Sequence, residues 1–262
     1  EGDRGAKEEE FTPFPGEAAG PGAKLLVFPE LCITGYTCQD LFLQELLLES
    51  AKATLARIVR ETKELDALIF VGLPWEKEGK LYNVAAAVQG GELLGLVPKT
   101  CLPNYGEFYE LRHFAPGNEE ADAVWVEFAG REGDYVPFGT NLLFTCPELP
   151  GLSVAAEICE DVWVPNPPSI RHALAGATVI VNLSASDETT GKDIYREALI
   201  GGQSARLVCG YVYANAGEGE SSQDLVFGGH NLIAENGKIL SRSARFKNET
   251  VYADLDIARI TG

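Results

Sequence analysis

Three residues of the chain have side chains that could together break an amide bond. Glu30, Lys99 and Cys159 each come directly after a short apolar stretch. A carboxylate can accept the proton of a thiol, and the thiolate can then attack a carbonyl carbon. An ammonium group can stabilise the oxyanion that forms. Placed together, the three residues would carry out acyl transfer through a thioester, without any histidine.

Each residue taken alone also has a simpler interpretation. A glutamate or a lysine at a strand end is usually solvated, and a free cysteine is usually an inert packing residue. The surroundings of two of the residues favour chemistry. Pro98 and Pro103 restrict the backbone around Lys99, and the acidic pair 160–161 and then prolines follow Cys159, so the chain must turn there. A thiol at such a turn projects into a cleft.

The elements that must position these residues are short continuous apolar runs, which are typical of buried strands. Glycines 90 and 91 between two such runs predict a hairpin, so parallel and antiparallel pairing coexist. Two sheets packed face to face, with helices outside, accommodate this α+β pattern, and strand ends at one sheet edge could bring the three residues together. Strands are predicted over 25–28, 67–71, 82–88, 93–97, 124–128, 142–145, 153–158, 178–183, 211–214, 225–233 and 251–255, and helices over 41–64, 168–175 and 193–208.

Five segments of the sequence resemble the nitrilase, or carbon-nitrogen hydrolase, superfamily. Within it they are most similar to the glutaminase domain of glutamine-dependent NAD synthetases, over about residues 24–257. The segments are FPELCITGYTCQDLF, PKTCLPNYGEFYELRHF, EICEDVWVP, NLSASDETTGKDIYR and QSARLVCGYVYANAGEGES.

The resemblance implies a four-layer αββα sandwich and hydrolysis of an amide or nitrile. It assigns Glu30 as general base, Lys99 as second catalytic residue and Cys159 as the nucleophile that forms a γ-glutamyl thioester. Glu110, in the segment EFYELRHF, matches the second glutamate that supports the trio in this superfamily.

The resemblance also implies a binding site for glutamine. Tyr105, Ser186 and Lys192 match residues that bind it in that family. Lys192 and Glu160 could divide the recognition of the α-carboxylate and the α-ammonium group. Without the resemblance, Tyr105 could be an ordinary half-buried aromatic residue and Ser186 a turn residue.

Three aromatic residues could line the pocket or belong to the core, namely Tyr36, Phe108 and Trp163.

Two parts of the chain are distinguished by composition and resemblance. Residues 24–262 are expected to form the glutaminase domain. Residues 1–23, rich in Gly, Pro, Glu and Ala, are expected to be an irregular arm or an incomplete form of the strand and helix that precede the catalytic glutamate in the family. The family's ATP-using synthetase domain, which would bind ATP and deaminated NAD, is expected outside this chain. No G-x-x-x-x-G-K-[ST] motif occurs here either. No cofactor is expected for the glutaminase part.

Charge and composition exclude several classes of partner. The 21 Lys and Arg against 39 Asp and Glu give a formal net charge of −18, which disfavours nucleic acid and anionic membranes. No run approaches the roughly 20 apolar residues of a membrane span, and the N-terminus lacks signal-peptide features, so a soluble, cytoplasmic protein is expected. The six dispersed cysteines are expected to be reduced. No C-x-x-C or paired histidines suggest a metal site, and we expect none.

The sequence therefore predicts release of ammonia from L-glutamine, feeding a synthetase domain that amidates deaminated NAD. A free-standing amidase acting on another small amide remains an alternative, and so does a non-catalytic assembly module. The resemblance also implies a homo-oligomer.

Overall fold

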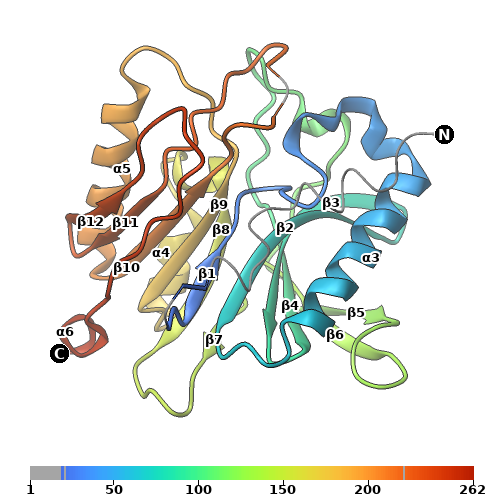
Figure 1. Cartoon of the computed structure of the whole chain (residues 1–262), viewed down its shortest axis with the longest axis horizontal. Coiled ribbons are helices and arrows are strands. Elements are labelled where there is room, and N and C mark those ends of the chain that lie inside the picture. Colours follow the sequence, from blue (N-terminus) through green and yellow to red (C-terminus); the bar gives the residue numbers. More distant parts are fainter. Residues whose placement is uncertain (1–18, 21, 221) are drawn as a thin grey trace.

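The computed structural model describes residues 19, 20, 22–220 and 222–262, so most of the predicted arm 1–23 lies outside the described residues. The described strands form two six-stranded sheets (Figure 1). The first sheet has the order β1-β2-β3-β4-β6-β5 and contains β1 (Leu25–Val27), β2 (Leu68–Lys77), β3 (Lys80–Gln89), β4 (Glu92–Pro98), β5 (Asp122–Val126) and β6 (Asp134–Phe138). The second has the order β12-β11-β10-β9-β8-β7 and contains β7 (Phe144–Thr145), β8 (Ser153–Ile158), β9 (Val179–Ser184), β10 (Gly210–Asn215), β11 (Leu232–Glu235) and β12 (Lys238–Arg242).

The described helices lie outside the two sheets or between strands. They are α3 (Glu45–Glu61), α4 (Pro168–Leu174), α5 (Lys192–Leu207) and α6 (Ile257–Thr261), with short 3-10 helices η1 (Tyr36–Leu43), η2 (Glu110–Arg112) and η3 (Cys159–Val162). In Figure 1, α3 lies against the first sheet and α5 against the second.

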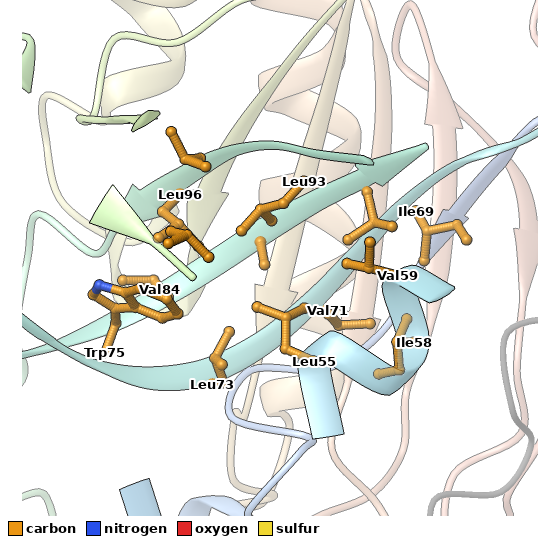
Figure 2. Close-up of a cluster of buried hydrophobic side chains, with 14 of the residues drawn as sticks. Leu55, Ile58, Val59, Ile69, Val71, Leu73, Trp75, Val84, Leu93 and Leu96 are labelled. Atoms are coloured by element: carbon orange, nitrogen blue, oxygen red, sulfur yellow. The ribbon is translucent and has the colours of Figure 1, made fainter. Parts of the chain in front are cut away.

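Alternation along β2 sends its side chains to two different cores. Val71 and Leu73 face outward and pack with Leu55 and Val59 of α3 (Figure 2). Phe70, the residue before Val71 in the strand, belongs instead to the core between the sheets. Successive strand side chains point to opposite faces, so one strand can serve both layers.

The two remaining interfaces complete the sandwich. Ala85 and Val97 of the first sheet meet Ala156 and Val181 of the second in the central core. On the far face of the second sheet, Ile200 of α5 packs with apolar residues of β10 and β11. The layers are therefore helix, sheet, sheet, helix, which confirms the predicted αββα sandwich.

Strand directions explain why the polar strand ends meet. The Gly90–Gly91 turn joins β3 and β4 as an antiparallel hairpin, as predicted, whereas β1 runs parallel to β2. In the second sheet β8, β9 and β10 are all parallel. The carboxyl ends of parallel strands lie at one edge of a sheet, so β8 and β9 both deliver residues to the same place.

Gly72 in β2 allows the segment that carries Glu30 to lie directly against the strand. A Cβ atom at this position would lie 2.7 Å from the carbonyl oxygen of Pro29 and would collide with the backbone nitrogen of Leu31. Backbone atoms cannot move aside as a flexible side chain can. Only glycine therefore fits here.

Some predicted elements differ from the structure. The strand predicted over 225–233 is wrong except at its end, because β11 begins at Leu232 and Gly229, with φ +62°, turns the chain before it. Residues 251–255 form no strand, although Leu255 packs on the central core. β6, β12 and α6 were not predicted. The proline within β6 and the few apolar residues of β12 hide the strand pattern.

Candidate active site

Lys99 lies at the centre of a buried cluster of charges. It directly follows β4, and its side chain is fully buried. Its ammonium nitrogen is 2.7 Å from Glu30 Oε1 and 2.7 Å from Glu110 Oε1. Charged groups are buried in proteins only when they are paired in this way. The structure thus brings together three of the residues singled out in the sequence.

Glu30 is held by groups from both sheets. Asn83 of β3 donates an amide hydrogen bond of 2.6 Å to Oε1, and the backbone N–H of Ala185, just after β9, donates to Oε2 at 2.9 Å. The backbone carbonyl oxygen of Asn83 also accepts the backbone N–H of Lys99. Both carboxylate oxygens of Glu30 are therefore fixed in direction, and the side chain links the two sheets.

Glu110 lies on the other side of the lysine, at the start of η2. The Tyr36 hydroxyl donates to Oε1 at 2.8 Å, while Oε2 has no hydrogen-bond partner among the described residues. Burial raises the pKa of Glu110 to about 7, although the positive charge of Lys99 opposes the rise. Burial lowers the pKa of Lys99, but the charges of Glu110 and Glu30 outweigh it and hold that pKa well above its usual value. The lysine is thus a permanent cation.

Cys159 stands at the sharp turn that the sequence predicts, as the first residue of η3 after β8. Its φ is +41°, in the left-handed region that most residues avoid. Its backbone N–H donates to Asn182 Oδ1 at 3.0 Å. Asp161 closes the turn by accepting the N–H of Ile158 at 2.9 Å and that of Cys101 at 2.7 Å. The nucleophile's turn is thereby tied to the loop that carries Lys99.

The thiol of Cys159 lies within electrostatic reach of the whole cluster. Burial raises its pKa above the usual range, and the negative charge of Glu30 raises it further. The charge of Lys99 and a hydrogen bond with Ser184 act in the opposite direction on the same pKa. At neutral pH the sulfur is therefore a protonated thiol, which needs a base before it can attack.

Glu160, Tyr105 and Phe108 form one wall beside the thiol. The Tyr105 hydroxyl donates to both carboxylate oxygens of Glu160, at 3.0 and 3.1 Å. The ring of Tyr105 packs edge-on against Phe108, with ring centroids 5.7 Å apart. Tyr105 is 59% exposed, whereas Phe108 is buried. The wall therefore has a polar rim and an apolar base.

Ser186 and Lys192 come from the stretch that runs from the end of β9 to the first residue of α5. Lys192 forms an ion pair with Asp187, and its ammonium nitrogen lies 5.4 Å from the centre of the Trp163 ring. Ser186 Oγ accepts a hydrogen bond of 3.2 Å from Arg196. Lys192 also acts electrostatically on Glu160. All ten predicted site residues therefore belong to one cluster or to its immediate surroundings.

A model of the carbon-nitrogen hydrolase family matches residues 12–262. This chain belongs to that family. Among curated proteins it is 46% identical over 225 residues to the glutamine-dependent NAD(+) synthetase of Mycobacterium bovis, covering 86% of this chain and 32% of that protein. It is 32% identical over 234 residues to the synthetase of Aquifex aeolicus, covering 89% and 36%. The chain thus spans about a third of the length of the curated relatives it matches.

Solved structures show the same fold. A glutamine-dependent NAD(+) synthetase from Cytophaga hutchinsonii superposes with a TM-score of 0.82 at 31% identity, covering 97% of this chain and 40% of that one. A nitrilase-superfamily amidase from Nesterenkonia has a TM-score of 0.68 at 20% identity, covering 92% and 81%. The latter likeness supports the fold alone.

Two residues of this carbon-nitrogen hydrolase were missed by sequence reasoning. Asn83 orients Glu30, and its signal was a polar residue at the start of an otherwise apolar strand. Arg196 is fully buried and donates to Ser186 and, at 2.6 Å, to Glu188. It lies one helical turn after Lys192 in α5, on the same side of the helix.

A large groove in the described part of the carbon-nitrogen hydrolase lies away from this cluster. The groove, of about 1030 Å³, runs between β1, β10 and the segment 247–255. Glu30, Lys99 and Cys159 do not line it. The site is therefore defined by its converging polar groups and not by the size of an opening.

The described ranges of the hydrolase hold no metal cluster, disulfide or membrane-spanning helix. No cluster of three or more His, Cys, Asp or Glu side chains there is arranged to hold a metal ion. No disulfide joins any of the six cysteines, all of which lie in those ranges. None of the helices described combines the length and apolar character that a membrane span requires.

Proposed function

We propose that this chain hydrolyses L-glutamine to glutamate and ammonia through a thioester on Cys159. The observation that carries the proposal is the buried Glu30–Lys99–Glu110 cluster acting on a protonated thiol. Such a cluster supplies a proton acceptor and a fixed positive charge beside a nucleophile. The names of the curated relatives, glutamine-dependent NAD(+) synthetases, support glutamine as the amide.

The reaction runs in two halves. Glu30 takes the proton of the Cys159 thiol as the sulfur attacks the amide carbon, and Lys99 stabilises the negative charge that develops on the amide oxygen. The carbon–nitrogen bond breaks, and ammonia leaves with the proton from Glu30. Water then attacks the thioester as Glu30 accepts its proton, and glutamate leaves as the carbon–sulfur bond breaks and the thiol is restored.

Glu110 acts by holding the lysine. Its carboxylate fixes the direction of the Lys99 ammonium group, and the Tyr36 hydroxyl fixes the carboxylate in turn. Glu30 can then exchange a proton while Lys99 keeps its position.

Recognition of an amino-acid substrate requires opposite charges on two sides of the thiol. We assign Glu160, with Tyr105, to the α-ammonium group of glutamine, and Lys192, with Ser186, to its α-carboxylate. Phe108 and Tyr36 supply apolar walls for the methylene groups. The support is electrostatic: Cys159 lies within reach of Tyr105, and Lys192 lies within reach of Glu160.

The ammonia would serve a synthetase domain outside this chain. In this proposal the glutaminase part uses no cofactor, and ATP and deaminated NAD bind at the synthetase domain, which amidates the latter. The relatives' names and the third of their length that this chain spans support this context.

We also propose a homo-oligomer, which light scattering on the full protein would test, since a monomer would contradict it. Dispersed cysteines favour a cytoplasmic location, and the net charge of −18 disfavours nucleic acid or membrane as a partner.

The mechanism is tested by replacing the nucleophile. Cys159→Ala should lower the rate of ammonia release from glutamine at least about a thousandfold, because the variant lacks the nucleophile that forms the thioester. Cys146→Ala is the matched control and should leave the rate unchanged. Parental turnover by Cys159→Ala would disprove the mechanism.

Substrate identity is tested separately. Glutamine should be hydrolysed in preference to a simple aliphatic amide or an N-carbamoyl amino acid. Turnover of those amides without turnover of glutamine would show a free-standing amidase instead. A glutamine-analogue electrophile should label Cys159 selectively, whereas slow, unselective labelling would indicate a non-catalytic module.

A further inference from the structure

Two hydrogen-bonded side-chain pairs lie beneath Cys159 and have no part in the mechanism above. Asn182 and Ser184 are two residues apart on β9, so they share one face of the strand, and Tyr211 and Tyr213 have the same relation on β10. The Asn182 amide nitrogen is 3.1 Å from the Tyr211 hydroxyl, and the hydroxyls of Ser184 and Tyr213 are 2.6 Å apart. All four side chains are buried. We call these the β9–β10 pairs.

Both pairs reach Cys159, at different atoms. Asn182 accepts the backbone N–H of Cys159 through Oδ1. Ser184 lies beside Cys159, because Ile158 pairs with Leu183 in the register of β8 and β9 and these two residues follow them. Its hydroxyl group lowers the pKa of the thiol. The residues of β9 therefore lie next to the nucleophile, and those of β10 act on it through β9.

Glu157 of β8 determines which side chain donates the hydrogen bond between Asn182 and Tyr211. The Tyr211 hydroxyl donates its only proton to Glu157 Oε1 at 2.5 Å, and Glu157 Oε2 accepts the N–H of Ser169 at 2.9 Å. Tyr211 can then only accept from Asn182, which must present its NH₂ group to the tyrosine. The Asn182 oxygen is left facing Cys159, where it accepts the N–H of a left-handed residue.

In the hydrogen bond between Ser184 and Tyr213, either hydroxyl can donate, and the protonation state of the Cys159 sulfur decides which one does. A thiolate accepts hydrogen bonds only, so Ser184 must donate to it, and Tyr213 must then donate to Ser184. Chains of hydroxyl donors of this kind polarise one another and stabilise a buried anion. The other charged groups acting on the sulfur are Glu30 after β1, Lys99 after β4 and Glu110 in η2. Titratable hydroxyls within electrostatic reach of it are those of Tyr36, Tyr105 and Tyr213.

We propose that the β9–β10 pairs prepare Cys159 for attack in two separable ways. The Asn182–Tyr211 pair positions the backbone of the nucleophile, and the Ser184–Tyr213 pair donates a hydrogen bond to its thiolate after Glu30 has taken the proton. This proposal rests on the proposed role of Cys159 as nucleophile. Ser184 touches the reacting atom, whereas Asn182, Tyr211 and Tyr213 are positioning residues.

The hydroxyl function is tested by the reactivity of the thiol itself. Iodoacetamide alkylation of Cys159, followed by peptide mass spectrometry from pH 6 to 10, needs no glutamine. Ser184→Ala and Tyr213→Phe should each slow alkylation about tenfold at a given pH, equivalent to a shift of about one pH unit in thiolate formation. Alkylation of buried Cys209 in the same samples reports any unfolding.

The positioning of the Cys159 backbone by the Asn182–Tyr211 pair is tested by kcat, and not by the alkylation rate of the thiol. Tyr211→Phe removes the acceptor that orients Asn182 and should lower kcat for glutamine about tenfold, with KM unchanged and Cys159 alkylation within twofold of the parent. Ser204→Ala is the control for both pairs, because Ser204 is an equally buried serine whose hydroxyl bonds to Gly201 and Gly237, away from the site. It should change neither readout.

The outcomes separate this proposal from the proposed function. Alkylation of folded Ser184→Ala and Tyr213→Phe at the rate of Ser204→Ala would overturn the hydroxyl function, and an unchanged kcat in Tyr211→Phe would overturn the positioning function. Glutamine turnover by Cys159→Ala would instead overturn the nucleophile role, whatever the alkylation rates.

Discussion

Glu157 carries a carboxyl group that no cation within the described structure neutralises. Its partners are the Tyr211 hydroxyl and the N–H of Ser169, and the side chain is fully buried. Burial raises the pKa of Glu157 from 4.5 to about 7. The folded protein therefore holds this proton at pH values where the unfolded chain has released it. Stability linked to Glu157 must fall as the pH rises from about 4.5 and level off above about 7.

Glu157→Gln should flatten that dependence, because glutamine cannot ionise and still offers an oxygen to Ser169. We expect the free energy of unfolding of the variant, relative to that of the parent, to rise by about 3 kcal/mol between pH 4.5 and 8. Urea denaturation at several pH values measures it. Glu76→Gln, at an exposed position, should retain the parental dependence of the free energy of unfolding on pH. If Glu157→Gln showed the same pH dependence as the parent, the raised pKa of Glu157 would be contradicted.

Lys99 separates two buried carboxylates, and its removal should therefore cost both stability and activity. Lys99→Met should lower the free energy of unfolding by about 3–5 kcal/mol and abolish glutamine hydrolysis. Adding Glu110→Gln should recover part of the stability but none of the activity, because one of the two facing charges is gone. Denaturation and ammonia release test the pair. Equal free energies of unfolding for Lys99→Met and for the double variant would show that repulsion between Glu30 and Glu110 does not cause the loss of stability.

The residues of the site differed in how far the sequence could predict them. Glu30, Lys99 and Cys159 each follow a buried strand, so their convergence could be argued from strand ends alone. Glu110 and Lys192 needed the family resemblance, because polar residues in loops and at helix starts carry no local signal of a shared site. Arg196 escaped notice because a buried arginine in an amphipathic helix looks like a solvated one.

The strands show a similar division. Long apolar runs such as β2, β3 and β8 were found, since their burial on both faces gives a continuous pattern. β12 was missed because its residues are half-buried or exposed and its pairing partner decides its structure. Local pattern alone cannot report such pairing.

Close packing of β2 against the turn that carries Glu30 makes Gly72 a sensitive position. Gly72→Ala should lower the free energy of unfolding by about 1–3 kcal/mol and reduce glutamine hydrolysis, since the added methyl group pushes the Pro29–Leu31 backbone away from the strand. Gly202→Ala is the contrasting control in α5, where nothing lies within 4 Å of the added atom. It should stabilise the protein by about 0.5–1 kcal/mol. A stable, fully active Gly72→Ala would contradict the argument.

The central core sets how the two sheets present their catalytic groups to each other. Phe70 of β2 is fully buried and packs edge-on against Phe144 of β7, with ring centroids 5.5 Å apart. Phe70→Ala should cost about 3–5 kcal/mol of stability and lower kcat even where the protein remains folded. The 85% exposed Leu174, changed to alanine, should alter stability by less than about 0.5 kcal/mol. Thermal denaturation and steady-state kinetics check both.

The order of the strands along the chain divides the protein into two consecutive halves. All strands of the first sheet end by Phe138, and all strands of the second begin at or after Phe144. Glu30, Lys99 and Glu110 belong to the first half and Cys159 to the second, joined by the stretch 139–143, in which Asn141 is exposed. Two fragments divided within that stretch would each be inert and would regain hydrolysis only on reassociation. The enzyme is therefore suited to fragment complementation, with released ammonia as the signal of reunion.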